Sequence, residues 1–317
     1  MKKTAKERRV LPGKQAPGKE KDMRKIILST DWWTDCDDAV AIRVLAHGQK
    51  SGLWQLCGVV VNACMVYSVR SIRGFLTHEG LGDAPVSIDR RATDFGGRPS
   101  YQKNLASKLG GSFTEADAGD PVTMLRTVLA GCADGEMEIV EIGYPQCLAA
   151  LLHSDPDGIS PLSGRDLVQK KVARLWMMAG NYENEEDGRE NNFARNARSA
   201  RGGADVCREW PTPITFLGWE AANTVISGGN LVAEDPLAGI LADHGSAKGR
   251  SSWDPLTVYM AMCGSPDAAG MDEIRGRVTV DPETGHNSFT RDGAGPHAYI
   301  KKRREDRWYE DRLNELL

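Results

Sequence analysis

A buried strand that runs straight into an acidic turn is the feature that most constrains this chain. The apolar, β-branched run Lys25–Thr30 predicts the strand. From Ala39 onward the apolar residues recur at helical spacing, and they stop near Gly48, which suits a helix end. Four aspartates stand between the strand and the helix, at Asp31, Asp35, Asp37 and Asp38. The chain therefore places four carboxylates at one strand-to-helix turn.

Like charges at that spacing repel one another unless a positive charge lies among them. The dipole of the following helix contributes only about 1 kcal/mol per charge, which is too little for four carboxylates. A bound divalent cation is the natural solution. Apart from Cys36, the side-chain ligands of this turn are oxygens, which favour calcium or magnesium over zinc. The alternative is an acidic helix N-terminus whose aspartates are simply solvated.

The rest of the chain alternates predicted strands with predicted helices. Strands are expected at 25–30, 56–62, 84–88, 137–142, 171–178 and 212–218, and helices at 67–80, 120–131, 146–152, 197–210 and 305–317, with two or three more between 219 and 264. The polar segments 90–119 and 181–195 are expected to be loops outside the core. This alternation predicts an α/β fold with a mostly parallel central sheet and helices on both faces. Ligands of such sheets bind beyond the carboxyl ends of the strands, where the acidic turn lies.

Composition narrows the class of protein. Residues 1–24 are rich in Lys and Arg and lack periodicity, so they predict a flexible basic tail ahead of one domain at 25–317. A net charge of −4 gives no reason to expect a nucleic-acid partner, and no apolar run is long enough to span a membrane. The seven cysteines are scattered and include no CxxC pair, as expected of reduced thiols. Together these observations predict a soluble, cytoplasmic protein.

The segment STDWWTDCDDAVAI, at residues 29–42, resembles the acidic motif of the inosine–uridine-preferring nucleoside hydrolase family. Other segments resemble further motifs of the family in the same order: GVVVNA (58–63), MEIVEIGYPQCLAALL (137–152), VARLWMMAGNY (172–182), ENNFARNARSA (190–200) and SWDPLTV (252–258). The resemblance implies that residues 25–317 form a catalytic domain with the nucleoside hydrolase fold. It also implies hydrolysis of an N-glycosidic bond.

The same resemblance implies a calcium ion and the residues around it. The ion would be bound by Asp31, Asp38, the main-chain carbonyl of Ile142, and Asp254. A metal-bound water would attack the anomeric carbon of a ribonucleoside or related N-ribosyl compound, with Asp31 as general base, to give ribose and free base. The sugar hydroxyls would be bound by Asp37, Glu190 and Asn192, with Asn62 and Asn181 as weaker candidates.

Trp253 departs from the family pattern, because many members have a histidine there to protonate the departing base. An indole does not titrate, and general acid catalysis contributes about 10²–10⁴ in rate. Three explanations stay open: another residue such as His244 is the acid, the leaving group needs little help, or the protein binds sugars and hydrolyses them poorly. Trp253 and Arg250 are also candidates to bind the leaving group by stacking and charge.

Two functions follow from the sequence. The first is a calcium-dependent hydrolase that cleaves an N-ribosyl bond. The alternative is a non-catalytic or weakly active calcium-dependent protein that binds a sugar or nucleoside on the same fold. In both cases the partner is a nucleoside-like small molecule, not a nucleic acid or a membrane, and the resemblance implies a homodimer or homotetramer.

Overall fold

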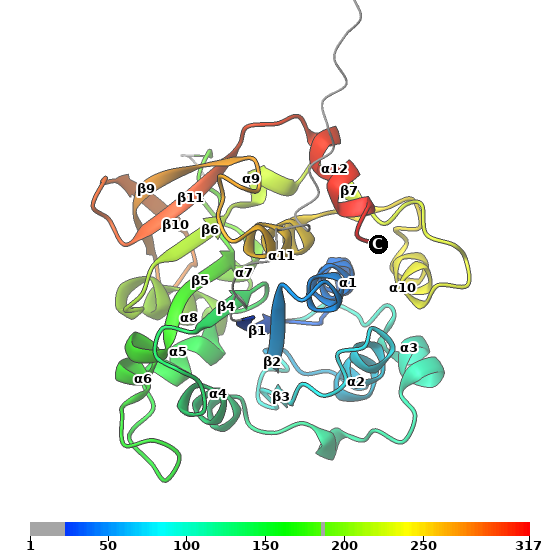
Figure 1. The fold of residues 1–317 in the computed structure, drawn as a ribbon, viewed down its shortest axis with the longest axis horizontal. Coiled ribbons are helices and arrows are strands. Elements are labelled where there is room, and N and C mark those ends of the chain that lie inside the picture. Colours follow the sequence, from blue (N-terminus) through cyan, green and yellow to red (C-terminus); the bar gives the residue numbers. More distant parts are fainter. Residues whose placement is uncertain (1–22, 185–187) are drawn as a thin grey trace, which may run out of the picture.

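The computed structural model describes residues 23–184 and 188–317, and within them a nine-stranded sheet forms the centre (Figure 1). The strands are β1 (Arg24–Thr30), β2 (Trp54–Val61), β3 (Val86–Ile88), β4 (Met137–Glu141), β5 (Val172–Met178), β6 (Ile214–Leu217), β9 (Met271–Val280), β10 (Asn287–Arg291) and β11 (His297–Lys302). Their order is β10-β9-β11-β6-β5-β4-β1-β2-β3. The strands from β11 to β3 pair in parallel, whereas β9 and β10 form an antiparallel edge. The predicted mostly parallel sheet is confirmed.

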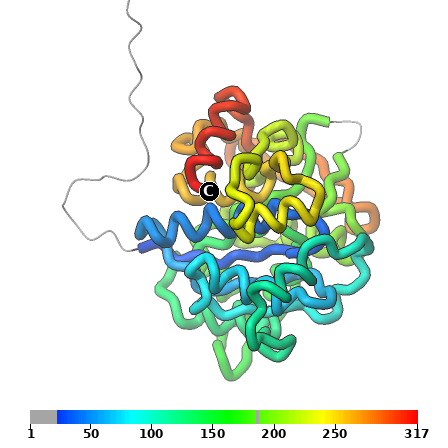
Figure 2. The backbone as a smooth tube through the Cα atoms, turned by 90° about the vertical axis from the view of Figure 1, so that its right-hand side faces the viewer, coloured from blue at the N-terminus to red at the C-terminus, as the bar shows by residue number. Residues whose placement is uncertain are grey.

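Helices cover both faces of this sheet, and Figure 2 shows them on either side of it. They are α1 (Asp37–Lys50), α2 (Ser68–His78), α3 (Gln102–Leu109), α4 (Pro121–Ala130), α5 (Gln146–Leu152), α6 (Gly164–Lys171), α7 (Asn191–Ala194), α8 (Ala197–Glu209), α9 (Trp219–Ala222), α10 (Pro236–His244), α11 (Trp253–Cys263) and α12 (Asp306–Asn314). A 3₁₀ turn at Glu115–Asp117 and a two-stranded antiparallel sheet of β7 (Ile226–Ser227) and β8 (Arg250–Ser251) complete the described elements.

Alternation along the strands divides the core into two layers. In β1 the side chains of Ile26 and Leu28 belong to the cluster that includes α1, α2 and α11, and Ile27 belongs to the cluster with α4, α5 and α8. Val60 of β2 and its neighbour Val61 are divided between the two clusters in the same way. Successive side chains of a strand point to opposite faces, so a strand buried on both faces reads as a continuous apolar run. This explains why the central strands are visible in the sequence.

Two segments predicted to be loops are more ordered than expected, and those predictions were wrong in part. Residues 90–119 contain α3, whose Gln102, Leu105 and Ala106 are buried on one face. Residues 181–195 contain α7, in which Asn192 and Phe193 are buried. Each helix is short and has few apolar residues, so its periodicity is weak in the sequence. Tertiary contacts supply the stability that composition does not reveal.

The predicted basic tail comprises residues 1–24, of which residues 1–22 lie outside the described part of the chain. Arg24, its last residue, begins β1, and its guanidinium pairs with the Glu138 carboxylate at 3.0 Å. Within residues 23–184 and 188–317, no helix combines the length and apolar character required to cross a membrane.

Candidate active site

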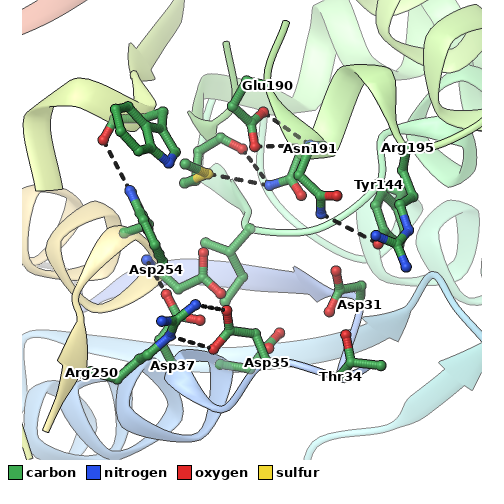
Figure 3. A pocket seen from close by; sticks show the side chains of 16 residues that line it. Asp31, Thr34, Asp35, Asp37, Tyr144, Glu190, Asn191, Arg195, Arg250 and Asp254 are labelled. Carbon is green, nitrogen blue, oxygen red and sulfur yellow. Dashed lines mark hydrogen bonds and ion pairs between the residues drawn. The ribbon is translucent and has the colours of Figure 1, made fainter. Parts of the chain in front are cut away.

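A cavity of about 270 Å³ lies at the carboxyl edge of the parallel strands (Figure 3). It is lined by Asp31, Thr34, Asp35, Asp37, Asp38, Ile142, Tyr144, Met178, Glu190, Asn191, Asn192, Arg195, Trp219, Arg250, Trp253 and Asp254. Asp31 directly follows β1, and Ile142 directly follows the neighbouring strand β4. Parallel strands end at the same edge, so residues distant in sequence meet there. Eight residues predicted to form the site line this one cavity: Asp31, Asp37, Asp38, Ile142, Glu190, Asn192, Trp253 and Asp254.

Three carboxylates in this cavity lie close enough to share a cation. Oxygens of Asp37, Asp38 and Asp254 lie within 4.8 Å of one another, and all three residues are buried. Asp37 and Asp38 open α1, while Asp254 lies in the first turn of α11, which packs against α1. The main-chain N–H of Asp254 also donates to Asp37 Oδ2 at 3.2 Å. Two helix N-termini therefore converge on one acidic cluster, which their dipoles favour.

Backbone N–H groups of the acidic turn hold the carboxylates of Asp31 and Asp38 in place. The N–H of Trp33 donates to Asp31 Oδ1 at 3.0 Å, and the N–H of Trp32 donates to Asp38 Oδ1 at 3.2 Å. The Thr30 hydroxyl donates to the same Asp38 oxygen. These bonds hold two carboxylates in place before any ligand arrives.

In this arrangement the backbone of Trp32 adopts a left-handed conformation, at φ 45°. Such a conformation costs a residue other than glycine about 1–3 kcal/mol, and it persists where the surroundings enforce it. The indole N–H of Trp32 donates to Ser71 Oγ at 2.8 Å, and its ring packs against Phe75 and Tyr101. The side-chain amide of Gln102, from α3, donates to the Trp32 carbonyl at 3.1 Å. A buried aromatic anchor therefore sets the shape of the turn.

The pKa values of these carboxyl groups indicate which kind of ligand the site favours. Burial raises the pKa of Asp31, Asp37 and Asp254 well above the usual range, and repulsion from the neighbouring aspartates raises each further. Burial also raises the pKa of Asp38, to about 7, against the hydrogen bond from the Thr30 hydroxyl. Buried carboxylates that repel one another bind a cation in order to ionise. The side-chain ligands are all oxygens, so the residues present fit a hard divalent cation such as calcium.

Glu190 and Asn192 form the opposite wall of the cavity. The Glu190 carboxylate accepts hydrogen bonds from the N–H of Gly180 at 3.0 Å and from the N–H of Asn192 at 2.9 Å. Burial raises the pKa of Glu190 to about 7, although these backbone hydrogen bonds oppose the shift. The Asn192 amide donates to the Met178 carbonyl, at the end of β5, at 2.8 Å. The short helix α7 is thereby tied to the edge of the sheet.

Asn62 and Asn181, the weaker sugar candidates, do not line the cavity. The buried Asn62 amide donates to Ser29 Oγ at 3.1 Å and to Glu141 Oε1 at 3.0 Å, and accepts from the Tyr144 N–H at 2.9 Å. Asn62 therefore ties together the ends of three strands. The backbone N–H of Asn181 instead donates to Asn287 Oδ1 at 3.0 Å.

Gly143 shows how closely these strand ends approach one another. A Cβ at residue 143 would lie 2.4 Å from the Asp31 backbone nitrogen and 2.7 Å from Asn62 Oδ1. Only glycine leaves room for the turn after β4 to pass so near the acidic turn.

Trp253 lies on the side of the cavity where Arg250 also lies. Its indole N–H donates to the Trp219 carbonyl at 2.9 Å, and the rings of Trp219 and Trp253 stack with centroids 6.5 Å apart. The Arg250 guanidinium lies 5.1 Å from the centre of the Trp253 ring and forms two hydrogen bonds to Asp35, at 2.6 and 2.9 Å. The single donor of Trp253 is therefore already used within the protein.

Asp35 and His244, which the sequence left without a firm role, belong to this side as well. Burial raises the pKa of the Asp35 carboxyl, but the hydrogen bonds and charge of Arg250 outweigh it, so the net pKa is lowered. His244 Nε2 lies 3.7 Å from Asp35 Oδ1, and His244 Nδ1 contacts Ser246 Oγ at 2.9 Å. His244 is not among the residues that line the cavity.

Sequence reasoning missed several residues of the cavity, namely Thr34, Tyr144, Met178, Asn191, Arg195 and Trp219. Most follow a predicted strand or lie within a matched motif, so position alone was the available signal. Tyr144, for example, stands in the turn after β4, and its ring stacks on Phe95 with centroids 3.8 Å apart. Contacts of this kind join segments that no local pattern relates.

Comparison with known proteins gives a fold. No family model and no curated protein matches the amino-acid sequence. A plant nucleoside hydrolase, PpNRh1, superposes with a TM-score of 0.64 at 17% identity, over 92% of this chain and 98% of the plant enzyme. The type III effector protein XopQ, solved in complex with adenosine diphosphate ribose, gives a TM-score of 0.62 at 19% identity, over 92% of each chain. The effector protein XOO4466 gives a TM-score of 0.62 at 20% identity, over 92% of this chain and 91% of the effector.

The chain therefore has the nucleoside hydrolase fold, and the resemblance read from its motifs is confirmed at the level of the fold. Identities this low establish architecture, and function must be argued from the cavity itself.

Proposed function

We propose that this protein is a calcium-dependent hydrolase of the N-glycosidic bond of a ribonucleoside or related N-ribosyl compound. The observation that carries the proposal is the buried cluster of Asp37, Asp38 and Asp254, with Asp31 in the same cavity. Such a cluster is costly to a protein that does not use it, because every buried charge must be compensated.

Calcium is the cation that this ligand set favours. The proposed ligands are Asp31, Asp38, Asp254 and the carbonyl of Ile142, and Asp37 is a further candidate because its carboxylate oxygen lies within 4.8 Å of those of Asp38 and Asp254. When bound, such a cation supplies positive charge that acidifies a coordinated water and orients sugar hydroxyls.

The proposed chemistry divides the labour among the side chains of the cavity. Asp31 accepts the proton of the attacking water as general base. Asp37, Glu190 and Asn192 bind the hydroxyls of the ribose, and the negative charges of Asp37 and Glu190 stabilise the positive charge that develops on the sugar ring. The water adds to the anomeric carbon as the bond to the leaving nitrogen breaks, and that nitrogen takes up a proton from solvent, which gives ribose and the free base.

A direct assay tests this proposal. Purine and pyrimidine ribonucleosides are incubated with the protein and calcium, and the release of reducing sugar is measured. We expect turnover of at least one compound and its loss when calcium is removed with a chelator. Binding of ribose without turnover of any N-ribosyl compound would contradict the hydrolase.

The second candidate is a binding protein that holds a ribosyl ligand on the same fold with little or no hydrolysis. The engaged indole of Trp253 favours it, because the Trp253 side chain does not titrate and its N–H already donates to the Trp219 carbonyl. The effector XopQ, solved with adenosine diphosphate ribose, carries a ribosyl ligand on this fold. The same assay, paired with a binding measurement, separates the two candidates.

Replacing Trp253 by histidine is expected to raise kcat for purine ribonucleosides by about 10²-fold, because an imidazole supplies the missing general acid. The gain should depend on pH and fade as the imidazole loses its proton above about pH 6.5. Trp253→Phe is the matched control, because it removes the indole without adding an acid. Equal rates for the two variants would show that the leaving group departs without protonation at this position.

A further inference from the structure

Arg195 lines the cavity, and no carboxylate of the described residues forms an ion pair with it. It directly follows α7, and its Nε–H donates to the Phe95 carbonyl at 2.5 Å. Within the described part of the chain, its two terminal amino groups have no hydrogen-bond or ion-pair partner. Arg250, the other arginine of the cavity lining, is instead neutralised by Asp35. The guanidinium of Arg195 therefore keeps its charge and its terminal N–H donors for a ligand.

The loop that contains Gly97 lies close to both Thr34 and Arg195. Gly97 has a left-handed backbone, at φ 86°, and a Cβ there would lie 2.7 Å from Thr34 Cγ2 and 3.4 Å from Arg195 Nη2. Phe95, in the same loop, stacks on Tyr144 and anchors the loop to the turn after β4. In Figure 3, Thr34, Tyr144 and Arg195 lie on one side of the cavity, and Arg250 and Asp35 lie on the other.

A guanidinium beside a hydroxyl is a ligand set for an oxyanion. Arg binds phosphate through parallel N–H donors in a fixed planar fork. The Thr34 hydroxyl, which hydrogen bonds to no other residue of the described chain, adds a donor on the same side of the cavity. Arg195 lies one helical turn beyond Asn192, which is a proposed sugar ligand. An anion bound by Arg195 would therefore lie next to the sugar, where a group attached to the sugar can reach it. A phosphate ester fits this position.

The negative charge of the cavity does not prevent this binding. The Asp35 charge is matched by Arg250, and the Glu190 carboxylate accepts hydrogen bonds from the N–H groups of Gly180 and Asn192. Asp31 lies on the same side of the cavity as Thr34 in Figure 3, and the proposed calcium compensates its charge together with those of Asp37, Asp38 and Asp254. Arg195 is itself exposed, so solvent and salt screen the remaining repulsion.

We propose that Arg195 and Thr34 form a phosphate subsite, so that the site binds a ribosyl phosphate of the nucleotide class more tightly than a neutral nucleoside. The inference rests on the proposed function for the position of the sugar. It names the substrate class of that same site.

Calorimetric titration of the calcium-loaded protein with ribose and with ribose 5-phosphate tests the subsite without any turnover. We expect ribose 5-phosphate to bind about 10- to 100-fold more tightly than ribose, the effect of a charged hydrogen-bonding pair. Arg195→Ala should remove that preference, and Arg195→Lys should restore part of it, since lysine keeps the charge but not the fork. Arg201→Ala, on an exposed arginine of α8 that does not line the cavity, is the matched control.

Kinetics on adenosine and adenosine 5′-monophosphate provide the second arm. We expect Arg195→Ala to raise KM for the monophosphate by about 10- to 100-fold and to leave KM for adenosine unchanged. Adenosine diphosphate ribose, tested in the same way, distinguishes a bridging diphosphate from a terminal phosphate as the group that is bound.

Two results would overturn the subsite. The first is equal affinity of the wild-type protein for ribose and ribose 5-phosphate. The second is an equal loss of affinity for ribose and for ribose 5-phosphate in Arg195→Ala, which would mean that Arg195 only positions the loop at Phe95. Absence of turnover on every compound would instead defeat the proposed hydrolysis, and the titration would still decide whether phosphate is bound.

Discussion

Replacing Asp31 by asparagine is expected to lower kcat by about 10²- to 10⁴-fold, the contribution of a positioned general base. Asparagine keeps the size of the side chain and can still accept the hydrogen bond from the Trp33 N–H, so the turn should keep its shape. It cannot take a proton from water. Release of reducing sugar from the best substrate of the nucleoside panel is the measurement, with calcium at saturation.

The control for this variant is Asp83→Asn, at an exposed aspartate that does not line the cavity, which should leave kcat unchanged. A thermal melt establishes that both variants fold. Asp31→Asn with wild-type kcat would show that Asp31 is not the base. A rise in KM with kcat intact would assign it to ligand or metal binding instead.

The central part of the fold was predictable because its strands are buried on both faces. The runs at residues 26–28 and 56–61 are apolar throughout, and 137–141 is apolar at Met137, Ile139 and Val140, so these strands stand out in the sequence without any knowledge of their partners. By contrast, α3 and α7 are short and mostly polar. They are stabilised by contacts such as the Gln102 amide with the Trp32 carbonyl, which no local pattern encodes.

The candidate site was predictable where residues follow strands or belong to a motif. The segments that resemble family motifs, in the family's order, contain four residues that line the cavity: Asp31, Asp38, Ile142 and Asp254. What the sequence did not reveal is how the side chains use their partners. The indole of Trp253 is committed to the carbonyl of Trp219, a contact between residues far apart in the chain.

Calcium is expected to raise the Tm of the protein by about 5 °C at a calcium concentration of 100 times Kd. Ligand at that excess contributes about 2.7 kcal/mol to the free energy of unfolding, and a domain of this size shifts by about 2 °C per kcal/mol. Differential scanning calorimetry with calcium and with a chelator measures the shift. Magnesium at the same concentration is the comparison, because its stricter octahedral geometry suits this cluster less well.

The metal-free protein should lose stability as pH rises from about 4 to about 8. An unfolded aspartate has a pKa near 3.9, whereas burial raises the pKa of folded Asp38 to about 7 and the pKa values of its neighbours in the cluster well above the usual range. Between these values the folded state binds more protons than the unfolded state, so the free energy of unfolding falls with rising pH. Three units for Asp38 alone correspond to about 4 kcal/mol. Calcium removes the penalty because it stabilises the ionised carboxylates, so its effect should grow with pH.

The variant Asp254→Asn separates the effect of charge repulsion on stability from the effect of calcium binding. Removing one of the mutually repelling charges should raise the Tm of the metal-free protein at pH 8, and losing a ligand should abolish most of the calcium shift. Asp83→Asn, which touches neither the cluster nor the cavity, should change neither quantity. A variant that keeps the full calcium shift would exclude Asp254 as a ligand. A metal-free wild-type protein equally stable at pH 5 and pH 8 would show that the folded carboxylates ionise without a cation, which removes the physical basis for the metal site.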